Sequence, residues 1–246
     1  MENPSNKELF SFIDLTSLNP NDSSASIDEF VNKAISYYDN NYKVAAVCVY
    51  PNFGRLVSTK LASTTINTAV VAACFPASQS FLEVKTRECE LAVKNGAQEV
   101  DIVINIGELL EGNTKEVVDE IRKIKNVIGK ASLKVIIESG LLKDLEIIKK
   151  ATQLSIEGGA DFIKTSTGKV DVGATPEAAI AMCEIIKTHQ SKTGQKVGIK
   201  ISGGVRSRAD ALVYYNIVKK YLGEEFLTQK YFRIGASSLA KALLTN

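Results

Sequence analysis

The sequence has few of the residues that commonly build metal and nucleophile sites. It contains one histidine, His189, and its four cysteines show no C-x-x-C spacing. A zinc site built on imidazoles is therefore excluded, and a Ser-His-Asp triad would have to use His189. That residue falls at the end of a helical pattern, which favours an exposed position on a helix. We expect no metal site.

Charge and hydropathy exclude two further classes of protein. The formal net charge is +2, so the chain has no general attraction to nucleic acid or to an anionic membrane. No apolar run approaches the length of a signal-peptide core or of a membrane span. Cysteines scattered without pairing signals favour a reducing compartment, so we expect a cytoplasmic protein without nucleic-acid or membrane partners.

Short β-rich runs alternate with amphipathic helical segments along the whole chain. Several runs are continuously apolar, as parallel strands covered on both faces should be. The length of 246 residues is close to the roughly 250 residues of a typical (β/α)8 barrel. No linker interrupts the alternation, so we predict an α/β protein with one (β/α)8 TIM-barrel domain over residues 1–246.

The eight predicted strands cover residues 10–14, 44–50, 69–74, 99–104, 133–138, 162–164, 198–202 and 232–235. A doubly wound open sheet is the alternative fold. Its Gly-x-Gly-x-x-Gly signature after the first strand is missing, which favours the barrel.

Charged residues are rare inside the predicted strands, and their charges are complementary. Each would be costly to bury alone. Those that stand out as candidates for chemistry are Asp14, Asp101, Lys134, Glu138, Lys164 and Lys200. For Asp14 with Lys134, a structural ion pair that supports the site is the simpler interpretation.

Two of these residues, Lys164 and Lys200, each lie in an apolar strand that runs into a turn rich in glycine and hydroxyls. One ammonium beside another in a partly desolvated pocket has its pKa lowered, so the neutral amine that attacks carbonyls becomes available. Residues 96–101 also align with residues 159–164, which places Asp101 opposite Lys164 in the pattern. Alternate strands of a barrel point into one interior layer, so these side chains are predicted to share a cavity.

Glycine- and serine-rich turns follow the last three predicted strands. The loops after strands seven and eight of such barrels commonly bind phosphate through backbone N–H groups. The need for a tight turn would by itself explain the glycines after either strand. The turns after all three strands together favour a phosphate site. The candidate residues are Gly168, Lys169, Gly203, Gly204, Gly235, Ser237 and Ser238.

These motifs, with residues 14–16, 47–51 and 134–138, resemble the deoxyribose-phosphate aldolase family over nearly the whole chain. The resemblance implies a barrel in which Lys164 forms a Schiff base, Lys200 lowers its pKa and Asp101 transfers protons. It also implies that the seven turn residues hold the 5-phosphate of the sugar. Ile201 stands where some members of the family carry proline or alanine, and its bulkier side chain predicts a reshaped pocket wall with unchanged chemistry.

The implied reaction is reversible cleavage of 2-deoxy-D-ribose 5-phosphate into D-glyceraldehyde 3-phosphate and acetaldehyde. It needs no cofactor, because the iminium supplies the polarisation that a metal would otherwise supply. For such a barrel we expect a homodimer. Three alternatives stay open: a transaldolase or another Schiff-base aldolase acting on keto-sugar phosphates, a pyridoxal-phosphate enzyme anchored by one lysine, and a non-catalytic sugar-phosphate binding protein.

Overall fold

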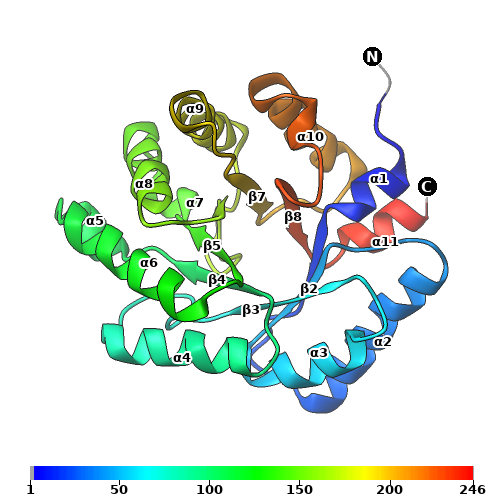
Figure 1. Ribbon diagram of the computed structural model, residues 1–246. Coiled ribbons are helices and arrows are strands. Elements are labelled where there is room, and N and C mark those ends of the chain that lie inside the picture. The colour runs from blue at the N-terminus through cyan, green and yellow to red at the C-terminus, as the bar shows by residue number, and fades with distance from the viewer. Residues whose placement is uncertain (1–2, 246) are drawn as a thin grey trace.

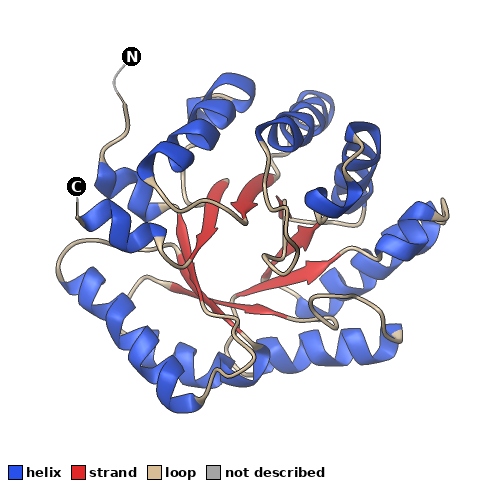
Figure 2. Cartoon of the chain, turned by 180° about the vertical axis from the view of Figure 1, so that it is seen from behind, coloured by secondary structure: helices blue, strands red, loops and turns tan. Residues whose placement is uncertain are grey.

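Eight parallel strands close into a barrel in the computed structural model, which describes residues 3–245. Each strand pairs with the next along the chain, and the last pairs with the first. The helices form an outer ring around the strands (Figures 1 and 2). The predicted (β/α)8 barrel is confirmed. Residues 1, 2 and 246 of the predicted domain lie outside the described residues.

The strands are β1 Ile13–Thr16, β2 Ala46–Val49, β3 Asn67–Val71, β4 Glu99–Val103, β5 Ser132–Ile136, β6 Phe162–Lys164, β7 Gly198–Ser202 and β8 Phe232–Ala236. The α-helices are α1 Asn6–Ser11, α2 Ser24–Asp39, α3 Gly54–Leu61, α4 Leu82–Lys94, α5 Ile106–Leu110, α6 Thr114–Ile128, α7 Ser139–Leu142, α8 Leu145–Glu157, α9 Pro176–Thr193, α10 Arg208–Leu222 and α11 Leu239–Leu244. Two 3₁₀ turns, η1 Pro51–Phe53 and η2 Glu224–Phe226, complete the described elements.

The first strand differs from its prediction. The sequence pattern predicts a strand over residues 10–14, but the chain is helical through Ser11 and β1 begins at Ile13. The backbone N–H of Glu8 donates to the hydroxyl of Ser5 at 3.1 Å, which caps a short helix. Leu9 and Phe10 are buried by this helix instead of by a strand.

The barrel has two different sets of buried side chains. Between strands and helices lies a continuous apolar layer, to which Ile201 belongs. The interior beside β2 and β3 holds small side chains, among them Ala46, Cys48 and Ala69. Because Ile201 alternates with Lys200, it faces the helices, and the predicted reshaping of the pocket wall is wrong. Within residues 3–245, no helix combines the length and apolar character needed to cross a membrane.

Candidate active site

Seven charged side chains lie in the barrel interior, each at most 4% exposed. They are Asp14, Glu99, Asp101, Lys134, Lys164, Lys200 and Arg233. Strand register brings them together: Asp101 lies beside Lys134, and Lys164 beside Lys200. The five of these residues that the sequence singled out therefore do share one site.

Asp101 is the centre of the cluster. Its Oδ1 accepts a hydrogen bond from Lys134 Nζ, and its Oδ2 accepts from both Lys164 Nζ and Lys200 Nζ, each at 2.8 Å. Burial alone would raise the pKa of the Asp101 carboxyl, but the three lysines hold that pKa well below its ordinary value. Asp101 is therefore an anion held between the three lysines.

Lys164 differs electrostatically from the other two lysines. Burial lowers the pKa of the Lys164 ammonium, and Lys200 acts in the same direction against the carboxylate of Asp101. Burial also disfavours the charged forms of Lys134 and Lys200, but neighbouring carboxylates raise the pKa of both above the ordinary value. Of the three, Lys164 is the amine that loses its proton most readily.

A pocket of about 510 Å³ opens at the carboxyl ends of β1, β6, β7 and β8. Lys164 lines it, whereas Lys134 and Lys200 are fully buried and do not line it. All the turn residues that the sequence predicted for phosphate also line this pocket: Gly168, Lys169, Gly203, Gly204, Gly235, Ser237 and Ser238. An amine at the base and a mouth rich in N–H and hydroxyl groups suit a small substrate with a carbonyl and an anionic end.

For some of these glycines, local structure alone explains why the residue is glycine. Gly203 and Gly204 have φ values of +83° and +92°, which strongly favour glycine whatever is bound. At Gly235 the reason is close packing, because a Cβ there would lie 3.0 Å from Cβ of Ser202 and 3.2 Å from Cε of Lys200. The absence of a side chain at Gly235 thus leaves room for the Lys200 side chain to reach Asp101.

Sequence reasoning missed two members of the charged cluster, Glu99 and Arg233. Arg233 pairs in register with Lys200, and Lys200 pairs with Lys164. Given this register, the alternation of side chains along β8 places Arg233 inside the barrel. Other pocket residues that the sequence did not single out are Thr16, Ser17, Leu18, Asn19, Thr167 and Arg206.

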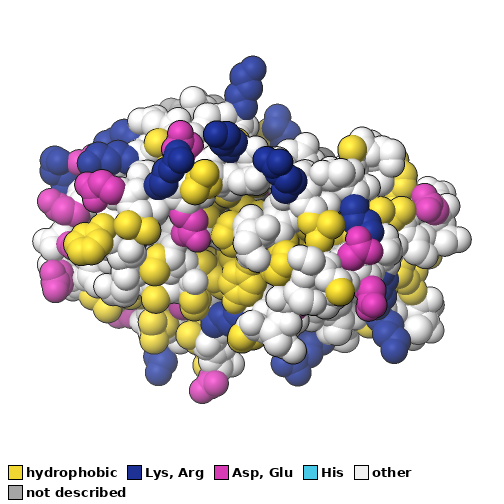
Figure 3. Space-filling view, turned by 90° about the horizontal axis from the view of Figure 1, so that it is seen from below, with side chains coloured by type: hydrophobic (Ala, Val, Ile, Leu, Met, Phe, Trp, Pro, Cys, Tyr) yellow, Lys and Arg dark blue, Asp and Glu magenta, His cyan; other side chains and the backbone are white. Residues whose placement is uncertain are grey.

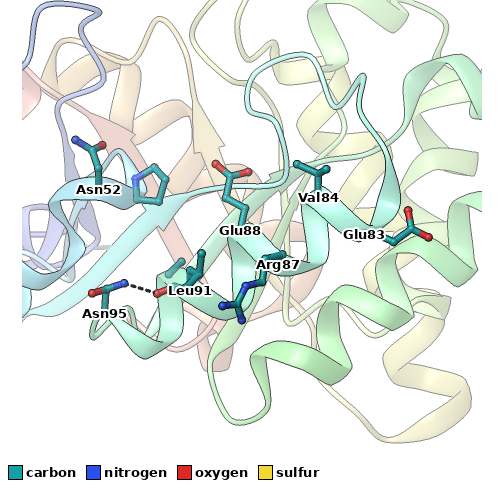
Figure 4. Close-up of a pocket in the computed structure, with 9 residues that line it drawn as sticks. Asn52, Glu83, Val84, Arg87, Glu88, Leu91 and Asn95 are labelled. Carbon is teal, nitrogen blue, oxygen red and sulfur yellow. Dashed lines mark hydrogen bonds between the residues drawn. The ribbon is translucent and has the colours of Figure 1, made fainter.

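A larger cavity, of about 680 Å³, lies outside the barrel mouth between η1 and α4. Figure 4 shows Val84, Arg87 and Glu88 on one side of this groove and Asn52 on the other. Figure 3 shows hydrophobic side chains gathered on the face that carries α3 and α4. No lysine lines the groove, so it is not a candidate for amine chemistry.

Fold and pocket together define a (β/α)8 barrel enzyme with an amine at the base of its substrate site. A family model described as "DeoC/LacD family aldolase" matches residues 9–219. The chain belongs to this family of aldolases.

Individual relatives agree with this assignment. The chain is 42% identical to human deoxyribose-phosphate aldolase over 241 residues, which cover 93% of this chain and 76% of that protein. Among solved structures, an aldolase designated QR15 has a TM-score of 0.79 at 32% identity, covering 96% of each chain. A deoxyribose phosphate aldolase from Aeropyrum pernix, described as tetrameric, has a TM-score of 0.80 at 27% identity, covering 98% of this chain and 92% of that one.

Proposed function

We propose that this chain is a deoxyribose-phosphate aldolase that cleaves 2-deoxy-D-ribose 5-phosphate reversibly into D-glyceraldehyde 3-phosphate and acetaldehyde. One observation carries the proposal: of the three lysines bonded to Asp101, only Lys164 lines the open pocket. The names of the relatives support the choice of substrate. No cofactor is invoked, because a lysine Schiff base supplies the electron sink.

The reaction begins when the neutral amine of Lys164 adds to C1 of the open-chain sugar. Loss of water gives an iminium, which draws electrons from the C2–C3 bond. As the C3 hydroxyl loses its proton, that bond breaks, D-glyceraldehyde 3-phosphate leaves and an enamine stays on Lys164. Protonation at C2 and hydrolysis then release acetaldehyde and restore the amine. Asp101, 2.8 Å from Lys164 Nζ, is placed to hold and return protons in these steps, with Lys200 beside it.

The phosphate is assigned to the turns after β6, β7 and β8. In this assignment Gly168, Gly203 and Gly204 present backbone N–H groups. Gly235, Ser237 and Ser238 complete the mouth on the side of β8. Lys169 is exposed and its Nζ donates to the backbone carbonyl of Leu18 across the mouth, so a bound phosphate can recruit this cation.

The protein is expected to cleave 2-deoxy-D-ribose 5-phosphate and to leave fructose phosphates uncleaved. Replacing Ser238 by Asp places a negative charge against the bound phosphate, so KM for the phosphorylated sugar should rise about tenfold or more. KM for unphosphorylated 2-deoxy-D-ribose should change far less. Steady-state kinetics measures the two KM values and the rate of cleavage of fructose phosphates.

Ser191→Asp is the matched control, because it adds the same charge at an exposed position on α9, outside the pocket. It should leave both KM values unchanged. Equal effects of Ser238→Asp on the two deoxyribose substrates would contradict the phosphate assignment. Efficient cleavage of a fructose phosphate would instead favour a transaldolase or another keto-sugar aldolase.

We also propose that the chain forms a homodimer through the groove between η1 and α4. Val84 and Leu91 are 53% and 40% exposed there, and the Aeropyrum pernix relative is described as a tetramer. Glu83, Arg87 and Glu88 border the groove. A two-fold axis can therefore set the arginine of one copy against the carboxylates of the other.

Light scattering should give twice the mass of the 26.7 kDa chain. Leu91→Glu should reduce it to that of a monomer, since a buried unpaired carboxylate is costly. Val213→Glu, at an exposed apolar position on α10, should leave the dimer intact. A wild-type monomer, or a dimer indifferent to Leu91→Glu, would argue against this interface.

For the chain as a whole, we propose one barrel domain over residues 1–246, working in the cytoplasm. The eight strands of the described residues form one closed barrel, which supports a single domain. The four cysteines are free, and Cys48, Cys89 and Cys183 are buried. Unpaired cysteines are typical of proteins in a reducing compartment, which supports the cytoplasm.

A further inference from the structure

The buried charges beneath Lys164 form a closed ring in which acids and bases alternate. The successive contacts are Asp101–Lys134 2.8 Å, Lys134–Glu99 2.6 Å, Glu99–Arg233 2.8 Å, Arg233–Asp14 2.6 Å, Asp14–Lys200 2.6 Å and Lys200–Asp101 2.8 Å. A longer contact of 3.7 Å crosses the ring between Lys134 and Asp14, so the predicted ion pair of these two residues is present within it.

The ring is electrically neutral by itself, because it contains three acids and three bases. Lys164 is attached from outside, through Oδ2 of Asp101. When its amine is protonated, the buried site carries one uncompensated positive charge, and when it is neutral the buried charges sum to zero. Since an unbalanced charge is costly in a desolvated interior, the ring favours the neutral amine.

The other groups around Lys164 do not change this balance. The ionisable groups that act on it are Asp101 on β4, Lys200 on β7 and Cys48 on β2, and Lys134 lies on the adjacent strand β5. Glu138, just after β5, is also buried, and its carboxyl group accepts hydrogen bonds from the backbone N–H and the hydroxyl of Thr167. Burial raises the pKa of the Cys48 thiol, and Asp101 acts in the same direction, so the thiol stays uncharged. The charged groups that act most directly on Lys164, Asp101 and Lys200, therefore both belong to the ring.

We propose that Arg233 and Glu99 are positioning residues that set the charge state of Lys164 through this ring, without touching the substrate. The inference rests on the proposed role of Lys164 as the reacting amine. Neither residue lines the pocket. Glu99 accepts a hydrogen bond from Asn67 Nδ2 at 2.7 Å, and the Arg233 guanidinium lies 5.5 Å from the ring centre of Phe162. Both are thus fixed at the far side of the ring from the substrate.

Opposite substitutions should act on Lys164 in opposite directions. Arg233→Met leaves the ring with one excess negative charge, which favours the protonated amine and raises its pKa. Glu99→Gln leaves one excess positive charge, which favours the neutral amine and lowers its pKa. Because only the neutral amine attacks the aldehyde, the acidic limb of kcat/KM should move to higher pH in the first variant and to lower pH in the second, each by about one pH unit.

Two further variants separate charge from packing. Arg233→Lys keeps the charge and should keep the acidic limb near its wild-type position. The double variant Glu99→Gln with Arg233→Met restores a neutral ring and should bring the limb back toward wild type. A merely structural role would lower stability in these variants without moving the limb in opposite directions.

The pKa of the Lys164 amine can also be measured without turnover. The folded proteins are acetylated competitively at a series of pH values, and modification of Lys164 is quantified by peptide mapping. This measurement distinguishes the ring from the proposed aldolase function, whose failure would appear as absent cleavage by the wild type. Shifts of the same sign in the two single variants, or no shift, would overturn the proposal. If Arg233→Met does not fold, Glu99→Gln decides it: a lowered pKa supports the ring, and an unchanged or raised pKa overturns it.

Discussion

Lys164→Arg is expected to abolish cleavage of 2-deoxy-D-ribose 5-phosphate, lowering kcat by at least about 10⁴-fold, the scale lost with a covalent nucleophile. A guanidinium stays protonated and cannot add to an aldehyde, although it keeps the positive charge beside Asp101. Borohydride reduction of the wild type with substrate, followed by peptide mapping, should place the substrate-derived carbon fragment on Lys164.

Lys192→Arg is the control for this experiment, because Lys192 is exposed on α9 and lies outside the pocket. It should keep both turnover and the trapped adduct. An adduct on Lys134 or Lys200 would reverse the assignment of the nucleophile. Substrate binding without any trapped adduct would instead favour a non-catalytic sugar-phosphate binding protein.

The second large effect is expected at Asp101. Asp101→Asn removes the carboxylate shared by three buried lysines. Breaking such a buried network costs about 3–5 kcal/mol of stability, and losing a proton-transfer group lowers kcat by about 10²–10⁴-fold. Urea unfolding and steady-state kinetics at a temperature where the variant is folded measure the two effects separately.

Glu120→Gln offers a matched comparison outside the site. Glu120 pairs with the buried Lys85 at 2.8 Å, between α4 and α6. Its loss should also reduce stability, but kcat of the folded protein should stay at the wild-type value. If Asp101→Asn behaved in the same way, with stability reduced and kcat intact, Asp101 would be a structural residue only.

The sequence predicted the barrel and the main chemistry for identifiable physical reasons. Alternation of apolar runs with amphipathic segments indicates parallel strands covered by helices, and the structure has that arrangement. Lys164 and Lys200 were found because a lysine in an apolar strand is conspicuous. The turns after β6, β7 and β8 were found because glycine and serine follow each strand, and the barrel brings those turns to one mouth.

The residues that sequence reasoning missed depend on relations between strands. Glu99 is the first residue of β4 and Arg233 the second of β8. A charged residue so close to the start of a strand is commonly exposed, and the alternation along β8 points inward for Arg233 only once its register with Lys200 is known. Their burial follows from the stagger of neighbouring strands, which one sequence does not contain. Ile201 is different, since its alternation with Lys200 already placed it on the outer face.

The ring of charges also divides the chain into two complementary halves. Its anions, Asp14, Glu99 and Asp101, come from β1 and β4, whereas its cations, Lys134, Lys200 and Arg233, come from β5, β7 and β8. Lys164, which is attached from outside the ring, lies on β6 in the same half of the chain. A half-barrel of four strands would bury charges of one sign only, at a high desolvation cost. Neither half can therefore complete its interior alone, and electrostatic attraction favours the docking of one half onto the other during assembly of the barrel.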